Sequence, residues 1–325
     1  MEVIDLKSRK KTSQSKTANS KANKTPEINF MDRASILAEA LPYIQKFSGE
    51  VFVIKIGGSA MGDPKVIEEF AKDVTLLKQI GVNPIIVHGG GTQIGEMLNK
   101  LKIKSEFIDG LRVTDRQTVD IVEMVLSGSI NKEIVTAINK QGGQAVGISG
   151  KDANLIIAQK LQKTRRDSDS NIEKILDLGF VGEPVTINPE ILYTLDESEL
   201  IPVIAPIGIS KDGQTYNINA DTVAGKIASS LNAYKLIVLS DVDGIYNGDK
   251  LVNSINIAEI NSLIKKKVIS AGMIPKTRTC IEALENGVNS AHILNGTTPH
   301  ILLVEVFTEH GVGTMINIEG NTPSK

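Results

Sequence analysis

The 325-residue chain is poor in several residue types that mark particular classes of protein. It has one cysteine, Cys280, no tryptophan, and only 4% aromatic residues. A single cysteine excludes an internal disulfide framework and favours a reducing compartment, because disulfides persist where the environment is oxidising. No apolar run approaches the roughly 20 residues that a membrane-spanning helix needs. We therefore expect a soluble protein that does not bind a membrane.

An excess of positive charge is missing as well. The chain has 36 Lys and Arg residues against 38 Asp and Glu residues, which gives a net charge of −2. Nucleic-acid binding calls for a basic surface and for aromatic side chains that stack on bases, so it is not expected here. Four histidines are scattered without the spacing of metal ligands, so we expect no metal site formed by the protein. The 41% hydrophobic content is enough for a sizeable core.

Residues 1–25 differ in composition from the rest of the chain. The stretch KSRKKTSQSKTANSKANKTP is rich in lysine, serine and threonine and has almost no apolar residues. Such a segment cannot bury enough surface to fold, so it is predicted to be a disordered basic tail. Transit peptides are also basic and rich in serine. The tail therefore leaves two locations open, the cytoplasm and the plastid stroma.

From residue 32 onward, strand-like runs alternate with helical patterns. The strand-like runs lie at residues 51–56, 83–88, 145–148, 155–159, 201–205, 235–239 and 291–294. The helical patterns lie at residues 32–47, 65–79, 92–100, 118–141 and 221–232, and Pro42 predicts a kink or a break in the first. The polar segment at residues 163–171 is predicted to be a loop. This alternation predicts an α/β fold with a mainly parallel sheet, whose ligand lies beyond the carboxyl ends of the strands.

Two glycine loops follow two of the predicted strands. The first is FVIKIGGSAM, in which Lys55 precedes Gly57 and Gly58, and the second is IIVHGGG, which ends with Gly89, Gly90 and Gly91. Glycines let backbone N–H groups approach an anion closely, and a following helix adds its positive end. The Lys55 ammonium could lie over a phosphate held by these amides. Phosphoryl transfer needs such positive charge, because negative charge moves to the leaving oxygen.

Each loop also has plainer interpretations. The second loop could be a tight turn without a ligand, and Lys55 could be a solvated side chain at the end of a strand. The spacing of Gly89, Gly91 and Gly95 is similar to a dinucleotide-binding loop without matching its G-x-G-x-x-G pattern. A nicotinamide-dependent dehydrogenase is therefore an alternative, but it gives no role to a second glycine loop with a lysine.

Three later stretches add candidate charged groups. Asp221 begins a helical pattern in NINADTVAG, where it could cap the helix or orient lysines. Lys276 follows Pro275 in GMIPKT at a predicted helix start, where a cation opposes the helix dipole and so suggests a functional reason. The stretch LSDVDGIY is a strand followed by an acidic glycine turn.

Taken in order, KIGGSAM, VHGGG, DGLRVTD, NINADTVAG, LSDVDGIY and GMIPKT resemble the amino acid kinase family over about residues 32–318. The resemblance implies an open αβα sandwich with a mainly parallel central sheet and two lobes, as in carbamate kinase. It assigns residues 49–233 to a lobe that binds the acyl amino acid and carries the dimer contact. Residues 234–325 then form the ATP-binding lobe.

Within the family, the motifs are most similar to those of members that phosphorylate N-acetyl-L-glutamate. These enzymes transfer the γ-phosphate of ATP to the side-chain carboxylate of that substrate, the second step of arginine biosynthesis. GLRVT and NINAD favour an acylated amino acid over the substrates of aspartate or glutamate kinase. Those kinases, and a non-catalytic arginine sensor on the same fold, are the alternatives.

The resemblance also implies a role for individual residues. Lys55 and Lys276 would stabilise the transition state, and Asp221 would organise both lysines. Arg112 would bind the α-carboxylate of the substrate through its planar fork, and Asn217 would be a second substrate ligand. The backbone amides of Gly57, Gly58, Gly89, Gly90 and Gly91 would hold the substrate and the transferred group. The nucleotide pocket would be lined by Asp241, Val242, Asp243, Gly244, Tyr246 and Met273, with Mg²⁺ held chiefly by the ATP phosphates.

Two segments are similar to parts of arginine-inhibited members of the family. Residues 26–48 resemble an N-terminal helix that joins dimers into a hexamer, a trimer of dimers. EVFTEHGVGT at residues 305–314 resembles part of an effector site for L-arginine, for which Glu305 is the first candidate, with Tyr43 and Gly311. A nitrogen signalling protein of the P-II type is a further possible partner. The chain departs from the family pattern at Ile56, Thr92 and Ala153, the last in place of a common glycine.

Overall fold

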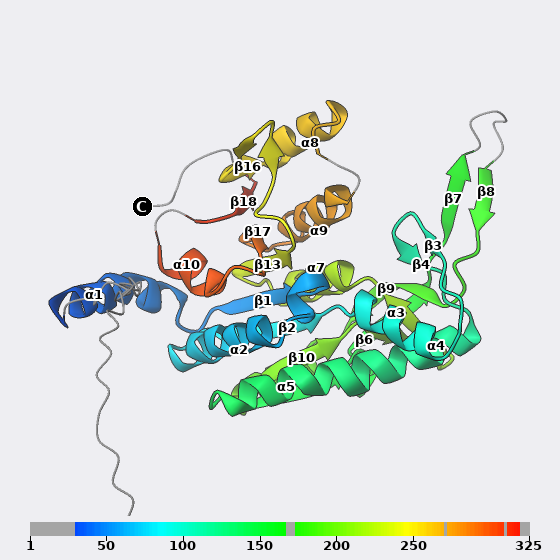
Figure 1. Cartoon of the computed structure of the whole chain (residues 1–325), viewed down its shortest axis with the longest axis horizontal. Coiled ribbons are helices and arrows are strands. Elements are labelled where there is room, and N and C mark those ends of the chain that lie inside the picture. Colours follow the sequence, from blue (N-terminus) through cyan, green and yellow to red (C-terminus); the bar gives the residue numbers. More distant parts are fainter. Residues whose placement is uncertain (1–29, 167–172, 270–271, 309–310, 319–325) are drawn as a thin grey trace, which may run out of the picture. The chain divides into compact units, whose positions relative to one another are not determined.

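The computed structural model describes residues 30–166, 173–269, 272–308 and 311–318 (Figure 1). The predicted basic tail at residues 1–25 lies outside these ranges, as do residues 309–310 of the predicted effector segment. Contacts divide the chain into one unit that ends at Glu39 and another that begins at Ala40. Helix α1 (Phe30–Phe47) contains this boundary and continues through Pro42, so the predicted break is absent and the kink stays a prediction.

An eight-stranded sheet lies at the centre of the unit that begins at Ala40. All its neighbouring strands are parallel except β17 and β18, which pair antiparallel. The strands follow the order β16 (Ser254–Asn256), β18 (Thr314–Asn317), β17 (Ser290–Asn295), β13 (Lys235–Ser240), β1 (Val51–Ile56), β2 (Asn83–His88), β10 (Ile201–Ala205) and β5 (Ala145–Ser149). The predicted mainly parallel sheet is confirmed.

Side chains on both faces of this sheet are buried in hydrophobic clusters. In β1, Phe52, Ile54 and Ile56 join one cluster and Val53 joins the other. Successive side chains of a strand point to opposite faces, so a sheet buried on both faces reads as a continuous apolar run. This is why the runs at residues 51–56 and 83–88 predict strands with the observed bounds.

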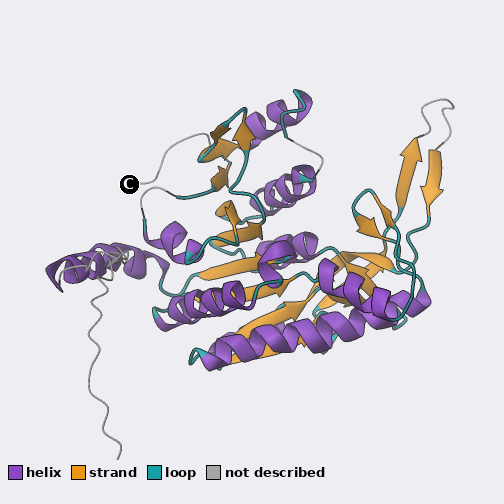
Figure 2. Cartoon of the chain, in the orientation of Figure 1, coloured by secondary structure: helices purple, strands orange, loops and turns teal. Residues whose placement is uncertain are grey.

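Helices supply the other half of each cluster, so the fold has three layers (Figure 2). One cluster includes side chains of α2 (Pro64–Gln79), α3 (Gly91–Lys100), α4 (Arg116–Glu123), the π-helix η2 (Met124–Ile130), α5 (Asn131–Lys140) and α10 (Ile301–Phe307). The other cluster includes side chains of α6 (Glu190–Glu197), α7 (Ala220–Ser230), α8 (Ile257–Lys265) and α9 (Met273–Glu285). The predicted αβα sandwich is therefore confirmed.

Smaller elements surround the sheet. A closed barrel contains β6 (Ile156–Lys160), β9 (Val181–Ile187), β11 (Ile207–Ile209) and β12 (Thr215–Ile218). The hairpins are β3 (Phe107–Ile108) with β4 (Leu111–Arg112), β7 (Lys163–Arg166) with β8 (Glu173–Leu176), and β14 (Tyr246–Asn247) with β15 (Lys250–Leu251). Short 3₁₀ turns are η1 (Gly58–Met61) and η3 (Asp152–Asn154). Figure 1 shows the β7–β8 hairpin projecting from the sheet.

Two sequence predictions differ from the observed elements. The polar segment at residues 163–171 was expected to be a loop, but Lys163–Arg166 forms β7, because pairing with β8 supplies the hydrogen bonds that composition cannot reveal. Residues 167–171 lie outside the described ranges. The single helix expected at residues 118–141 is α4, η2 and α5, with a π-helical segment between two α-helical ones. A π-helical turn inside an α-helix is rare and too short to show an apolar period of its own.

Candidate active site

The two glycine loops lie side by side at the carboxyl ends of the sheet strands. Strands β1 and β2 are parallel neighbours with Ile56 opposite His88, so both loops leave the sheet at the same level. The N–H group of Gly89 donates a 2.7 Å hydrogen bond to the carbonyl of Ile56. A Cβ atom added to Gly57 would lie 3.6 Å from the Cα atom of Gly89 and 3.0 Å from Nζ of Lys55. The bare Gly57 thus leaves room for the lysine ammonium, and the hydrogen bond from Gly89 to Ile56 joins the two loops.

Lys55 and Lys276 both contact Asp221. The Nζ atom of Lys55 lies 2.9 Å from Oδ1 of Asp221, and that of Lys276 lies 3.5 Å from Oδ2. Lys55 lies two residues after Val53, on the β1 face that packs against α7, and Asp221 belongs to the first turn of α7. The strand period and the helix start therefore bring the pair together.

The electrostatics of this cluster favour an added anion. Burial opposes the charge of Asp221, but Lys55 and Lys276 outweigh it, so the pKa of this carboxyl lies below its ordinary value. One carboxylate and two ammonium groups leave one unit of positive charge among largely buried side chains. A transferred phosphoryl group would supply the missing negative charge.

Asp221 is not the cap of its helix. The side-chain oxygen of Asn219 accepts hydrogen bonds from the N–H groups of Asp221 and Thr222 at 2.9 and 3.1 Å. Asn219 is therefore the N-cap, and the Asp221 carboxylate is left to the lysines. Asn219 was not among the residues predicted from the sequence, although asparagine two residues before Asp221 is a capping signal.

Arg112 reaches the second glycine loop from β4. Its Nη2 atom donates a 2.7 Å hydrogen bond to the carbonyl of Gly91, and its Nη1 atom donates to the hydroxyl of Ser105. The guanidinium lies 4.5 Å from the ring centroid of Phe107. Burial lowers the pKa of Arg112, yet arginine stays protonated in proteins. Its charge is thus held beside the loop, as expected for a group that binds a carboxylate.

The predicted nucleotide residues follow β13, which pairs parallel with β1 and ends at the same edge. Asp243 accepts hydrogen bonds from the Tyr246 hydroxyl and the Asn295 amide, at 2.8 and 2.9 Å. Asp241 and Val242 are exposed, and Met273 begins α9, the helix that carries Lys276. These positions agree with a nucleotide pocket, and the binding roles stay predictions.

Asn217 lies outside the lysine cluster, on β12 of the small barrel. Its backbone N–H donates a 2.9 Å hydrogen bond to the carbonyl of Phe180, and its side chain is part-exposed. Strand β12 leads into α7 through Asn219. Asn217 therefore lies close in the chain to Asp221, and its role as a substrate ligand stays a prediction.

The first effector candidate, Glu305, lies in a buried charged cluster. Its Oε1 atom lies 2.7 Å from Nδ1 of His292, and Nζ of Lys235 lies 3.1 Å from Nε2 of the same ring. Burial opposes the charge of Glu305, but His292 and Lys235 outweigh it and lower its pKa. Burial also lowers the pKa of Lys235, to about 8. Lys235 and His292 were not predicted as site residues, because their positions in the sequence are those of ordinary strand residues.

The other two effector candidates border this cluster. A Cβ atom added to Gly311 would lie 2.8 Å from Oε2 of Glu305, so the bare backbone leaves room for the carboxylate. Tyr43 stacks on Phe47, and the Phe47 ring lies 5.5 Å from Nζ of Lys235. All three candidates thus belong to one region at α10 and the end of α1.

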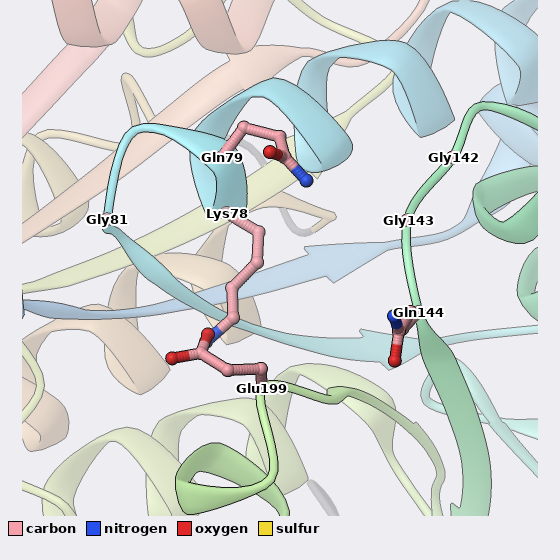
Figure 3. Close-up of a pocket in the computed structure, with 7 residues that line it drawn as sticks. All are labelled: Lys78, Gln79, Gly81, Gly142, Gly143, Gln144 and Glu199. Carbon is pink, nitrogen blue, oxygen red and sulfur yellow. The ribbon is translucent and has the colours of Figure 1, made fainter.

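A separate cavity of about 410 Å³ lies at the opposite edge of the sheet (Figure 3). It is lined by Lys78, Gln79, Gly81, Gly142, Gly143, Gln144 and Glu199. Gln144 directly precedes β5, so the cavity lies where the parallel strands begin. Figure 3 shows Lys78 and Glu199 pointing toward each other, and their charged atoms lie 3.0 Å apart. This cavity has no part in the site formed by the glycine loops.

Two kinds of feature are absent from the described residues. No helix in those ranges combines the length and the apolar character needed to cross a bilayer. In the same ranges, no three His, Cys, Asp or Glu side chains group in a way that could hold a metal ion.

Comparison with known proteins identifies the family. The model of the amino acid kinase family matches residues 50–295. Acetylglutamate kinase of Parvibaculum lavamentivorans is 56% identical over 297 residues, covering 91% of this chain and 98% of that protein. These two findings confirm the predicted enzyme class, a phosphotransferase.

Solved structures with the same fold include N-acetylglutamate synthase from Neisseria gonorrhoeae. Its complex with coenzyme A and N-acetyl-glutamate has a TM-score of 0.76 at 26% identity, and covers 89% of this chain. Its complex with coenzyme A and L-arginine has the same TM-score at 25% identity, and covers 88%. The present chain spans 64% and 65% of those two chains. Its motifs, its fold, the family model and a relative matched over 98% of its length all agree, so the chain belongs to the amino acid kinase family.

Proposed function

We propose that the protein transfers the γ-phosphate of MgATP to the side-chain carboxylate of N-acetyl-L-glutamate. The observation that carries the proposal is the contact of Lys55 and Lys276 with one buried carboxylate, Asp221, beside two touching glycine loops. The likeness to acetylglutamate kinase over 98% of that protein's length supports the choice of substrate.

In the proposed reaction, a carboxylate oxygen of the substrate attacks the γ-phosphorus and the bond to the β-phosphate oxygen breaks. The products are an acyl phosphate and ADP. No general base is needed, because the attacking carboxylate is already ionised near neutral pH. Two anions must approach each other, so the two lysines and the loop amides supply the compensating charge. Arg112 would bind the α-carboxylate at the second loop, and Mg²⁺ enters as part of the nucleotide substrate.

The proposal is tested by trapping the acyl phosphate with hydroxylamine. N-acetyl-L-glutamate, L-glutamate and L-aspartate are supplied separately with MgATP. Hydroxamate from the acetylated substrate alone supports the proposal. Product from another acceptor would favour aspartate or glutamate kinase activity, and no product from any acceptor would favour the sensor.

We further propose that L-arginine inhibits the enzyme by binding at Glu305. A guanidinium matches a carboxylate through two parallel hydrogen bonds. Glu305 is held ionised at the end of a chain of contacts through His292 and Lys235 to Phe47 of α1. The likeness to a synthase crystallised with L-arginine supports an effector of this kind.

Replacing Glu305 with glutamine tests the effector site. The rate is measured with and without L-arginine. Glu305→Gln is expected to raise the L-arginine concentration for half inhibition about ten-fold or more, because the charge-assisted pair is lost. Glu282→Gln removes a surface carboxylate of α9 and is the control. Equal inhibition of the Glu305 variant and the wild-type protein would exclude this site.

We propose a homo-oligomer, a hexamer, in which α1 forms part of the contact. Ile36, Leu37 and Leu41 of α1 are 56%, 73% and 52% exposed, and apolar side chains grouped at a surface often mark an interface. A truncation at residue 48 would also remove Phe47, which is buried in the core. Substitution is therefore sharper: Leu37→Glu with Leu41→Glu should lower the mass measured by light scattering, whereas Ser35→Glu should not.

The remaining partner and the location are also proposals. We propose a P-II-type signalling protein as a partner, on the resemblance of α1 and of the GMIPKT segment alone. Co-elution of the two purified proteins tests it. We propose the cytoplasm as the location, with the plastid stroma as the alternative, and a fluorescent fusion of the full chain distinguishes them.

A further inference from the structure

His88, the last residue of β2, is a fully buried histidine directly before the second glycine loop. Its Nδ1 atom lies 2.8 Å from the carbonyl oxygen of Gly89. A carbonyl only accepts hydrogen bonds, so Nδ1 carries a proton. Burial lowers the pKa of His88 to about 4, so the ring is neutral near pH 7 and its Nε2 atom is left as an acceptor.

Asn131, the first residue of α5, supplies the partner for that acceptor. Its Nδ2 atom lies 3.3 Å from Nε2 of His88 and donates a 2.8 Å hydrogen bond to the carbonyl of Val203 in β10. Its Oδ1 atom accepts a hydrogen bond from Lys132, whose ammonium also reaches the carbonyl of Gly147 in β5. Asn131 therefore ties three adjacent strands together under the loop.

The π-helix η2 packs against the same loop. A Cβ atom added to Gly90 would lie 2.4 Å from Cδ1 of Ile130 and 2.7 Å from Cδ2 of Leu126, both of which belong to η2. Gly90 thus lacks a side chain because η2 fills the space beneath it. A π-helical turn shifts every later residue around the helix axis, and such turns often occur at functional sites. Here Asn131 directly follows that turn.

We propose that His88 and Asn131 are positioning residues that fix the orientation of the Gly89–Gly91 loop for the reaction, with η2 as their support. The inference rests on the proposed function. His88 holds the carbonyl side of the peptide after Gly89, so it sets the direction in which the N–H group of Gly90 points. The carbonyl of Gly91 accepts a hydrogen bond from Arg112, so a tilted loop would also move the group expected to bind the substrate carboxylate.

The consequence for catalysis should be selective. The nucleotide residues at 241–246 follow β13 and belong to a different loop. Loss of the His88 contact should therefore weaken use of the acyl amino acid and leave the KM for ATP within about two-fold. A displacement of about 1 Å in a reacting group can cost on the order of 100-fold in rate.

Two substitutions at position 88 separate positioning from simple loss of stability. His88→Leu fills a similar volume and removes both hydrogen bonds. His88→Asn keeps an N–H donor near the place of Nδ1 and loses the contact with Asn131. Ile138→Val, in the same helix α5 and buried, is the matched control for destabilisation, because its side chain is remote from the loop in the chain.

The kinetic expectation is that kcat/KM for N-acetyl-L-glutamate falls roughly 10- to 100-fold in His88→Leu and is unchanged in Ile138→Val. In His88→Asn it should be only partly restored, because the Gly89 contact is kept and the Asn131 contact is lost. Hydrogen exchange of the peptide that contains residues 89–91 is measured on the same proteins without substrate. It should be fastest in His88→Leu and intermediate in His88→Asn.

The two measurements keep this inference apart from the proposed function. Loop exchange and kinetics in His88→Leu equal to those of wild-type protein would overturn the positioning role. A His88→Asn protein as impaired as His88→Leu would overturn the role of the Gly89 hydrogen bond. A wild-type protein that makes no acyl phosphate would overturn the proposed function, and the exchange measurement would still decide whether His88 orders the loop.

Discussion

Lys55 forms a 2.9 Å ion pair with Asp221, and this pair joins the first strand of the sheet to the start of α7. Lys276 reaches the other oxygen of the same carboxylate from α9. One buried aspartate therefore holds two lysines that come from separate elements. The cluster is preorganised, because its charges are placed before a substrate binds.

Removal of either lysine should reduce the chemical step more than substrate binding. We expect Lys55→Ala and Lys276→Ala each to lower kcat more than about ten-fold, with a cost of roughly 3–4 kcal/mol if each acts like an oxyanion-hole donor. Steady-state kinetics and circular dichroism give the rate and the state of folding. Lys226→Ala, on the solvent side of α7, is the control. A wild-type kcat in either lysine variant would refute the assignment of that residue.

Arg112 should act on the acyl amino acid and not on the nucleotide. Lysine keeps the charge but lacks the planar fork that reaches both Gly91 and Ser105. Arg112→Lys is therefore expected to raise the KM for N-acetyl-L-glutamate about ten-fold or more and to leave the KM for ATP nearly unchanged. Arg116→Lys, in which the exposed arginine of α4 is replaced, should change neither. An equal rise in both KM values would indicate a general distortion instead.

The junction between α2 and α10 should make stability depend on pH. His300 lies 2.7 Å from Asp73 and 3.0 Å from Glu69. Burial raises the pKa of Asp73 to about 6. The hydrogen bond with Asp73 raises the pKa of His300, with burial and Lys72 opposing it. Both folded-state pKa values exceed their unfolded values of 3.8 and 6.5. The folded protein thus binds more protons than the unfolded chain, and this proton binding stabilises the fold at low pH. The stabilisation is lost as the pH rises from about 3.8 through the raised pKa of His300.

Asp73→Asn tests this dependence, because asparagine fits the same space and does not titrate. As the pH rises from about 4 to beyond 6.5, the free energy of unfolding should fall less in the variant than in the wild-type protein. Urea unfolding at several pH values measures the difference. Asp249→Asn removes an exposed carboxylate and should follow the wild-type curve. Parallel curves for wild-type protein and Asp73→Asn would show that the junction does not titrate in this range.

Ala153 is a site where one substitution should add stability. Its φ of +49° and ψ of +24° lie in the left-handed region, which costs a residue with a Cβ atom about 1–2 kcal/mol. Glycine avoids this strain but loses part of the gain to the greater freedom of the unfolded chain. We expect Ala153→Gly to raise the free energy of unfolding by about 1 kcal/mol or less. Ala137→Gly, inside helix α5, should lower it by about 1 kcal/mol. Thermal unfolding that places both variants below the wild-type protein would contradict the strain at Ala153.

Much of the site follows from local pattern. The apolar runs at residues 51–56 and 83–88 predict buried parallel strands, and the glycines that follow place two loops at the carboxyl edge. Lys55 lies two residues after Val53 in the strand, so the two side chains point to the same face of the sheet. The family pattern has a glycine where this chain has Ala153, and the backbone there is left-handed, as glycine favours. Each of these inferences uses neighbours within one strand or turn, where sequence spacing fixes geometry.

The tertiary structure decided which residues from distant parts of the sequence come into contact. The strand order places β13 beside β1, so the predicted nucleotide loop leaves the sheet beside the end of β1 that carries Lys55. Packing of η2 explains the bare Gly90, the Gly89 carbonyl fixes the tautomer of His88, and Asn131 faces the other ring nitrogen. His292 and Lys235 outweigh the burial of Glu305 and keep the pKa of its carboxyl below the ordinary value. The sequence by itself determined the strands, the loops and the candidate charges, because periodicity and turn chemistry are local. Only the folded chain decided which charges meet, because those contacts depend on the order in which the elements pack.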